Sequence, residues 1–460
     1  MGLSEVRNKP VIEKINDFLV SPSYILSVIL LTALANLFSL ELAVYTLFVA
    51  VALYTAVLGR DLLPWVPLVV CGYLAPSEKS NPGKYTDSIF RSGHGAEYVL
   101  VLAVLVFVAV GLYILRNPKG FFKAKRRFLW GLLALSGAYL LGGLMSPAQP
   151  KFTEKNLTFA ALQAGTLLVP YYVISGGVRW EKAPKDFLCQ TGFGVGCMLL
   201  VQILGIYLSG DVVEKGVIDR DRIFTGWGMH NNIGGMLAMM LPFAFGVFRN
   251  RRWLGTVMGA VFLAGVCLTS SRSSMMAGAV IYVVCVLAQL KTKQGRSGCL
   301  IALGGIAAVV AILALIFRQE LSKLFTDILD RGTSLNYRDE IWKEGFKQFK
   351  KYPVFGGGFF PIGYVPYDFS TVADFSGFFP PRWHNTLVQL LASTGLVGVL
   401  AYGFHRFQTV WMLVKNRTRQ NAFIGVYFLV MVATCLFDCH FFNIGPVLFY
   451  AMVLAFAERE

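Results

Sequence analysis

The pair His384-Asn385 lies where a polar stretch, residues 318–383, gives way to a long apolar run. Histidine titrates near neutral pH, so its imidazole can take a proton from a hydroxyl group as a general base. Here the imidazole precedes a segment that is long and apolar enough to be a membrane helix. The sequence therefore predicts a site for acid–base chemistry at the water-facing end of that helix.

Two arginines accompany this histidine in similar positions. Arg272 lies between two apolar runs, and Arg338 lies in the polar stretch. A guanidinium stays charged at any relevant pH and binds phosphate oxygens through two parallel hydrogen bonds. Two guanidiniums and one imidazole suit group transfer from a phosphate-linked donor, because the imidazole can deprotonate the acceptor hydroxyl while the arginines stabilise the departing pyrophosphate. We expect four further residues to contact the substrates: Arg222, Asn232, Asn385 and Trp342.

The composition places these residues in an all-α membrane protein. The chain is 55% hydrophobic and only 15% charged, and its mean hydropathy is +0.59. That is more apolar surface than a soluble fold of this length can bury. Alternation typical of a barrel is absent, so we expect a polytopic bundle of 12–14 transmembrane helices. The predicted segments are 23–40, 42–59, 62–76, 96–115, 128–146, 156–175, 187–208, 231–248, 253–270, 273–290, 299–317, 384–404, 421–437 and 441–457. The short segment 62–76, with two prolines, and the closely spaced segment 273–290 are alternatively re-entrant.

Charge predicts the orientation. If both termini are cytoplasmic, every strongly basic loop falls on the cytoplasmic side, as the positive-inside rule requires. The formal net charge of +16 then reports membrane orientation, and we expect no nucleic-acid partner. The eight cysteines lack metal-ligand spacing and are expected to be small core residues.

The chain is expected to form one integral membrane domain over residues 1–460. Residues 1–22 are polar and amphipathic, without a cleavage site, and are expected to lie in the cytoplasm or along the membrane surface. Residues 318–383 form a large extracytoplasmic loop. In this loop we expect one helical stretch over 318–329 and a second amphipathic helix from Arg338, ended by Pro353.

These motifs, in this order, resemble those of the O-antigen ligase and polymerase superfamily of bacterial envelope glycosyltransferases. Its members share an Asn before an apolar helix, a Ser-Arg near the next outer turn, two motifs in a large loop, and a His-Asn that opens the following helix. The corresponding residues here are Asn232, Ser271-Arg272, Arg338 with Trp342, Pro353 with Gly356 and Gly358, and His384-Asn385. The likeness spans roughly residues 220–440. One departure is Ser393, where family members commonly carry a Glu.

The resemblance implies a glycan donor carried on undecaprenyl pyrophosphate and a lipid or glycan acceptor. Transfer would occur with inversion, without a metal, cofactor or nucleotide sugar, at the extracytoplasmic face of the plasma (inner) membrane. His384 would be the base, and Arg272 and Arg338 would hold the pyrophosphate. The sequence leaves open whether the acceptor makes the protein a ligase or a polymerase, and it does not indicate the oligomeric state.

Simpler interpretations exist for most of these residues. Asn232 and Asn385 can be helix caps, and Arg272 can be an anchor at a helix end. His230 is a rival base, whereas we expect His440 to be a surface residue. The spacing of Asp219 and Asp221 also permits a divalent cation, although a charged loop produces it often.

A transporter is the alternative of another class. Transporters place ionisable groups near the bilayer midplane and show repeated halves. Here the polar residues gather at one interface and the halves do not resemble each other, so the sequence favours an enzyme.

Overall fold

The structure is a computed structural model of the chain. It describes residues 7, 9–76, 95–145, 150–180, 184–210, 212–214, 217–226, 228–291, 293, 295–316, 318, 338–360, 382–416 and 422–459. Most of the predicted loop 318–383, including the predicted helix over 318–329, and the loop that contains His94 lie outside the described residues.

The described chain is almost entirely helical, which confirms the predicted all-α fold. The helices of the first half are α2 (Pro10–Leu19), α3 (Pro22–Phe38), α4 (Glu41–Val57), α5 (Trp65–Leu74), α6 (Gly95–Arg116), α7 (Pro118–Lys123), α8 (Leu129–Leu144), α9 (Pro150–Gly177) and α10 (Pro184–Leu208). A short segment follows with β1 (Val213–Glu214), β2 (Val217–Ile218), η2 (Arg220–Arg222), β3 (Phe224–Thr225) and β4 (Gly228–Met229). The second half contains α11 (His230–Val247), α12 (Arg252–Leu268), α13 (Arg272–Leu290), α14 (Arg296–Ile316), α16 (Arg338–Lys351), α17 (Thr386–Lys415), α18 (Ala422–Cys435), η4 (His440–Phe442) and α19 (Ile444–Ala457).

Each predicted apolar segment coincides with a helix. Within the described residues, six helices are long and apolar enough to cross a membrane: α6, α9, α10, α13, α14 and α17. Helices α2 and α3 meet at a 65° bend and would make a seventh span if counted together. Several other apolar helices have only 10–17 residues, and α5 with 10 residues rises about 15 Å. Helix α13 is a full helix of 19 residues, so its predicted re-entrant alternative is not needed.

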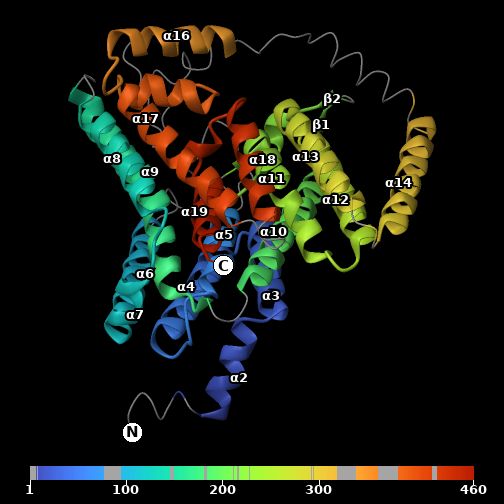
Figure 1. The fold of residues 1–460 in the computed structure, drawn as a ribbon, viewed down its shortest axis with the longest axis horizontal. Helices are drawn as coiled ribbons and strands as arrows, with labels where there is room; N and C mark the ends of the chain where they lie inside the picture. Colours follow the sequence, from blue (N-terminus) through green and yellow to red (C-terminus); the bar gives the residue numbers. More distant parts are fainter. Residues whose placement is uncertain are drawn as a thin grey trace.

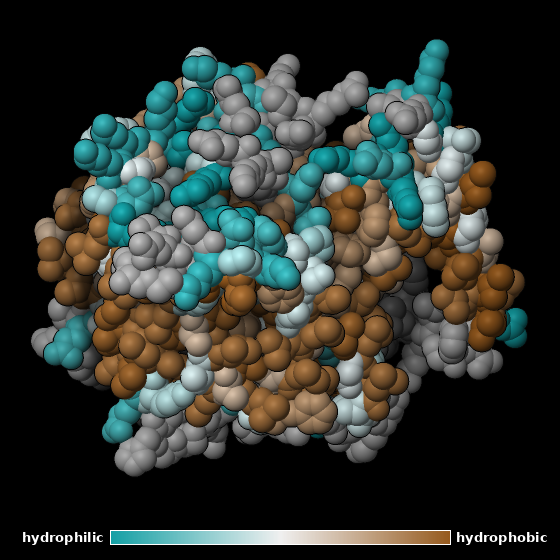
Figure 2. All heavy atoms as spheres, turned by 90° about the horizontal axis from the view of Figure 1, so that it is seen from below, coloured by the Kyte–Doolittle hydropathy of each residue, from teal (hydrophilic) through white to brown (hydrophobic). Residues whose placement is uncertain are grey.

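The helices pack around one apolar core that runs from Leu19 to Ala457. Figure 1 shows α16 lying across one end of the bundle and α2 and α7 at the other, with α14 standing apart from the rest. We call these the α16 end and the α2 end. The outward side chains of α14 are apolar and exposed, as expected for a helix that faces lipid. On the face seen in Figure 2, a broad apolar area adjoins a smaller region of hydrophilic residues.

Helix α17 is broken near the α16 end. Gly395 has φ 62° and ψ −155°, which interrupts the helical hydrogen bonds. The segment after α16 supplies replacements, because the N–H of Gly357 donates to the carbonyl of Ala392 at 2.7 Å and the N–H of Leu396 donates to that of Pro353 at 2.8 Å. Backbone groups at membrane depth need such partners. The break therefore fixes the segment after α16 against α17.

The glycines at this contact are needed because two backbones meet there. A Cβ on Gly356 would come within 2.3 Å of the carbonyl carbon of Ser393, and a Cβ on Gly395 would come within 2.5 Å of the carbonyl oxygen of Val354. Both glycines also have positive φ. The side chain of Ser393, at the departure from the family pattern, is fully buried, and its hydroxyl accepts a hydrogen bond from Gln389 Nε2 at 3.0 Å.

Helices α18 and α19 are short, and η4 joins them. Each has 14 residues and rises about 21 Å, less than the ~30 Å of a hydrocarbon layer. Helix α19 ends near the α2 end, where Glu458 Oε2 accepts the backbone N–H of Arg127 at 2.6 Å, close to the start of α8. Helix α19 alone therefore does not cover the depth of such a layer, and η4 connects its start to the end of α18.

Candidate functional site

The site is built around the first residues of α17. Asn385 is the N-cap of this helix, since its side-chain oxygen accepts the backbone N–H groups of Leu387 at 2.8 Å and Val388 at 3.1 Å. Its Nδ2 donates to the carbonyl of Leu436 at 2.8 Å, which ties α17 to the end of α18. The capping role considered for Asn385 is thus observed, together with a second bond that positions the neighbouring His384.

His384 has an unusual backbone conformation. Its φ is 50°, in the left-handed region that few residues other than glycine adopt. Such strain persists only where the surroundings impose it, and it is common at functional sites. The preceding Trp383 is 2% exposed, and its backbone N–H donates to Gln389 Oε1 at 3.1 Å. The buried tryptophan and the capped helix together hold the imidazole in a partly exposed position.

The amphipathic helix predicted from Arg338 is α16, and it packs over this segment. Ile341 of α16 contacts Trp383 and Val388 in a small apolar cluster separate from the main core. The indole Nε1 of Trp342 donates to the carbonyl of Trp383 at 2.9 Å, directly before His384. The Arg-x-x-x-Trp spacing therefore has a structural role in which Trp342 holds the backbone of the histidine.

Arg338 lies one helical turn before Trp342, so both side chains emerge on the same face of α16. The positive charge of Arg338 contributes to lowering the pKa of His440, which places the guanidinium within electrostatic range of that imidazole. Arg338 and His384 thus approach the same region from different elements.

An acid that the sequence analysis did not select faces His384. Asp438 lies between α18 and η4, and its Oδ1 is 3.7 Å from His384 Nδ1. The carboxylate is 6% exposed and also accepts the N–H of Cys439 at 2.7 Å. Burial alone would raise the pKa of Asp438, but the hydrogen bond from the side chain of His384 and that from the Cys439 N–H oppose burial, and the pKa is held well below its usual value. Asp438 therefore stays ionised beside the imidazole.

His440 was expected at the surface, and that prediction is wrong. It is 1% exposed, and a Cβ on Gly235 of α11 would come within 2.3 Å of its Cε1. Burial lowers the pKa of His440, the charge of Asp438 opposes this, and Arg338 and Arg382 lower it further. Among the described residues its Nδ1 has no hydrogen-bond partner. The imidazole is therefore neutral and forms part of the floor of the site.

Asn232 joins the same floor from α11. It lies inside the first turn of this helix, whose N-cap is Met229, so the capping role considered for it is not observed. Its Oδ1 instead accepts a hydrogen bond from Asn443 Nδ2 at 2.6 Å. This bond connects α11 with the N-cap of α19, one turn from His440.

Arg272 is the first residue of α13, a helix that packs against α11. Close packing joins α13 to α11 at this point: Ser274 Oγ accepts from Ser271 Oγ at 2.9 Å and donates to the carbonyl of Asn231 at 3.5 Å. A Cβ on Gly234 would meet Thr269 Oγ1 at 2.5 Å. The start of α13 is thus fixed beside the start of α11, and Arg272 lies at the same end of the bundle as His384, Arg338 and Asn232.

Arg222 lies in η2, before α11. Its Nε forms an ion pair with Asp219 Oδ2 at 3.0 Å, and the side chain is 45% exposed. Because this arginine already pairs with Asp219, that carboxylate is a poor candidate for a cation ligand. Among the described residues no group of three potential metal ligands occurs.

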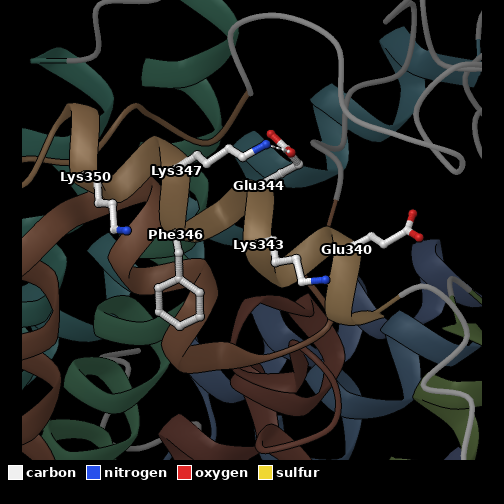
Figure 3. Close-up of a pocket in the computed structure, with 6 residues that line it drawn as sticks. All are labelled: Glu340, Lys343, Glu344, Phe346, Lys347 and Lys350. Carbon is white, nitrogen blue, oxygen red and sulfur yellow. Dashed lines mark hydrogen bonds and ion pairs between the residues drawn. The ribbon is translucent and has the colours of Figure 1, made fainter.

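The outward surface of α16 forms a cavity of about 570 Å³ that none of the predicted site residues lines. Figure 3 shows Lys347 and Glu344 directed at one another, with Phe346 pointing away from them. Lys343 is 3.9 Å from Asp339. Two of the cavity's three lysines, Lys343 and Lys347, thus pair with neighbouring acids, and none of its lining residues is a candidate for the catalysis described above.

The sequence contained weak signals for the two missed residues. Asp438 and His440 lie between apolar segments, in Phe437-Asp438-Cys439-His440. Charged residues so close to hydrocarbon are costly and therefore usually functional. No spacing rule links them to His384, which lies on another helix.

Comparison with known protein families gives a match for part of the chain. Residues 257–403 match the model of the family described as O-antigen ligase. Residues 257–403 therefore have the sequence pattern of an O-antigen ligase domain. The matched region of the ligase domain contains Arg272, Arg338, Trp342, His384 and Asn385, whereas Asn232 and Asp438 lie outside it. No curated protein matches the chain.

Proposed function

We propose that this O-antigen ligase-family protein transfers a glycan from undecaprenyl pyrophosphate to an envelope acceptor on the extracytoplasmic face of the plasma membrane. The observation that carries the proposal is the His384–Asp438 pair next to η4, whose His440 also lies within electrostatic range of Arg338. A base, a buried carboxylate that stabilises it and a nearby guanidinium are the groups that such a transfer needs.

In the proposed reaction an acceptor hydroxyl attacks the anomeric carbon of the donor sugar. The proton goes to His384, whose Nδ1 lies 3.7 Å from Asp438 Oδ1. The bond between the anomeric carbon and the pyrophosphate oxygen breaks, and its electron pair leaves with undecaprenyl pyrophosphate. Asp438 stabilises the imidazolium that forms, as a buried carboxylate does in other base–acid pairs.

Arg338 and Arg272 would stabilise the pyrophosphate as its charge increases. Arg338 comes from α16 and Arg272 from α13, so the two guanidiniums approach from different elements. Hydrogen-bond donors that the protein already holds in position stabilise such developing charge most effectively, because they need not rearrange during the reaction. Asn232, in the first turn of α11, and Arg222, in η2, would complete the contacts to the donor.

The depth of the site supports a lipid-linked donor. Helix α19 rises ~21 Å, less than a ~30 Å hydrocarbon layer, so we infer that the floor at η4 lies below the membrane surface. A pyrophosphate joined directly to an isoprenoid lies close to the hydrocarbon boundary. A recessed floor lets that group reach the arginines while its lipid remains in the bilayer.

The test is a transfer reaction with purified protein, an undecaprenyl-pyrophosphoryl glycan and candidate acceptors, followed by mass analysis of the products. His384→Gln is expected to lose at least ~100-fold in rate, because general base catalysis contributes 10²–10⁴-fold. Arg272→Lys keeps the charge but loses the two-point contact, so activity should also fall strongly. A wild-type rate in His384→Gln would refute the assignment of the base.

His230 provides the rival assignment for the base. This imidazole is 5% exposed and opens α11. If His230→Gln abolished transfer while His384→Gln did not, the base would be His230. The same reaction identifies the acceptor class, since a glycan joined to a different lipid anchor indicates a ligase and a lengthened lipid-linked glycan indicates a polymerase.

A further inference from the structure

A polar cavity lies at the α2 end, opposite the candidate active site. It encloses about 290 Å³, and its wall includes four arginines from separate parts of the chain: Arg7, Arg60, Arg116 and Arg179. The only acid among its lining residues is Glu13. The lining therefore carries four positive charges and one negative charge, a formal balance of +3.

Two of these arginines are fixed by backbone carbonyls at the end of α4 and directly after it. Arg116 Nη1 donates to the carbonyl of Ala56 at 2.8 Å and its Nη2 donates to that of Gly59 at 2.8 Å. Arg7 Nη2 donates to the carbonyl of Val57 at 2.6 Å. Neutral carbonyls orient the guanidiniums but do not neutralise their charges.

The other two arginines are only partly compensated by acids. Arg60 forms an exposed ion pair with Asp17, and such pairs contribute little. Asp61, near Arg60 and Arg179, is 9% exposed and accepts the backbone N–H groups of Leu63 and Arg179. If both aspartates are counted with the lining, the formal balance falls from +3 to +1, so the cavity remains positive.

Two guanidinium groups retain donor capacity. Among the described residues, the Nε of Arg7 is shielded from solvent without a hydrogen-bond partner. Within the same part of the chain, no hydrogen bond or ion pair of the Arg179 side chain is observed, and this residue is exposed. Buried polar groups are normally satisfied, so the shielded Nε of Arg7, together with the exposed guanidinium of Arg179, gives this positive cavity donors for an anionic ligand.

We propose that this cavity binds a phosphate oxyanion, namely the headgroup phosphate of an anionic phospholipid in the leaflet at the α2 end. Guanidiniums match phosphate oxygens in geometry and charge. The cavity lies where α4 and α6 end and α2 begins, the level of lipid headgroups. Basic pockets between membrane helices are known to bind such headgroups.

The experiment uses the full chain purified in a non-ionic detergent. Its dissociation constant and thermal midpoint are measured with short-chain phosphatidylglycerol, with matched phosphatidylcholine and with inorganic phosphate. We expect phosphatidylglycerol to bind and to raise the midpoint, and phosphatidylcholine to do neither. Inorganic phosphate that binds and stabilises as well as phosphatidylglycerol would overturn the lipid source and assign a soluble phosphate to the cavity.

The variant Arg60→Gln/Arg179→Gln removes two cations without touching the Arg116 bonds to α4. Its dissociation constant for phosphatidylglycerol should rise about 30-fold, from ~1 kcal/mol for each basic residue near the membrane surface. Arg251→Gln is the matched control, because Arg251 is an exposed arginine at the start of α12 that does not line the cavity. Equal binding by the double variant and this control, or equal binding of the two lipids, would overturn the proposal.

Discussion

The substitution Asp438→Asn tests how much of the proposed catalysis depends on the charge beside the base. Asparagine keeps the size of the side chain and can still accept the N–H of Cys439, which Asp438 Oδ1 accepts at 2.7 Å. Only the negative charge that faces His384 is removed. The variant therefore separates the electrostatic role of Asp438 from its packing.

The size of the effect follows from the distance. Two unit charges 3.7 Å apart interact by about 4 kcal/mol at an effective dielectric constant of 20. His384 is 26% exposed, so water screens part of this energy and the range becomes about 2–4 kcal/mol. If this energy stabilises the imidazolium in the transition state, kcat should fall by ~30-fold to ~1000-fold.

The assay is the rate of glycan transfer by purified protein at saturating donor, with the thermal midpoint measured in parallel. The matched control is Glu458→Gln. Glu458 is also a buried carboxylate that accepts a backbone N–H, but it lies at the α2 end, so this variant should lose stability without a comparable loss of kcat. A kcat for Asp438→Asn within twofold of the wild type would refute the reasoning, because the charge would then not act on the base.

Three further predictions follow from the same region. Trp342→Phe keeps the aromatic packing but loses the bond to the Trp383 carbonyl, so transfer should fall about fivefold from a loss of ~1 kcal/mol, measured as kcat at constant KM; an unchanged kcat would contradict the positioning role. Gly395→Ala should lower the free energy of unfolding by at least ~2 kcal/mol, measured by chemical denaturation, because a Cβ meets a backbone carbonyl at 2.5 Å and φ is 62°. His440 has a lowered pKa in the folded state, so the unfolded chain binds more protons and stability should decrease as the pH falls below ~6.5. In His440→Gln the thermal midpoint should decrease less over this pH range, and an identical pH dependence would contradict a buried neutral imidazole.

The helices and part of the site could be predicted because their signals are local. Apolar runs of sufficient length define helices whatever their neighbours are, and the amphipathic pattern after Arg338 predicted α16. Asn385 precedes an apolar run, which is a cap signal that needs no tertiary contact. His384 followed from its place at this boundary.

The remaining features depend on contacts between distant segments. Gly395 lies in an apolar run that resembles an uninterrupted helix, and the break becomes stable only because residues after α16 supply hydrogen bonds. Asp438 acts on a histidine of another helix, and no periodicity in the sequence indicates that pair. His440 was assigned to the surface because polar residues between helices are usually solvated, whereas here the short α18 and α19 carry it into the interior.

The shortness of α19 has a consequence for the environment in which the protein works. A helix of 14 residues cannot stretch to follow a thicker bilayer, so each added ångström of lipid lengthens the path from the interface to the η4 floor. Bilayers accommodate such mismatch by local thinning at a cost of fractions of a kcal/mol per Å. The length of the lipid acyl chains would thus influence the rate of glycan transfer, because shorter chains bring the pyrophosphate of the lipid carrier nearer to Asp438 and His384.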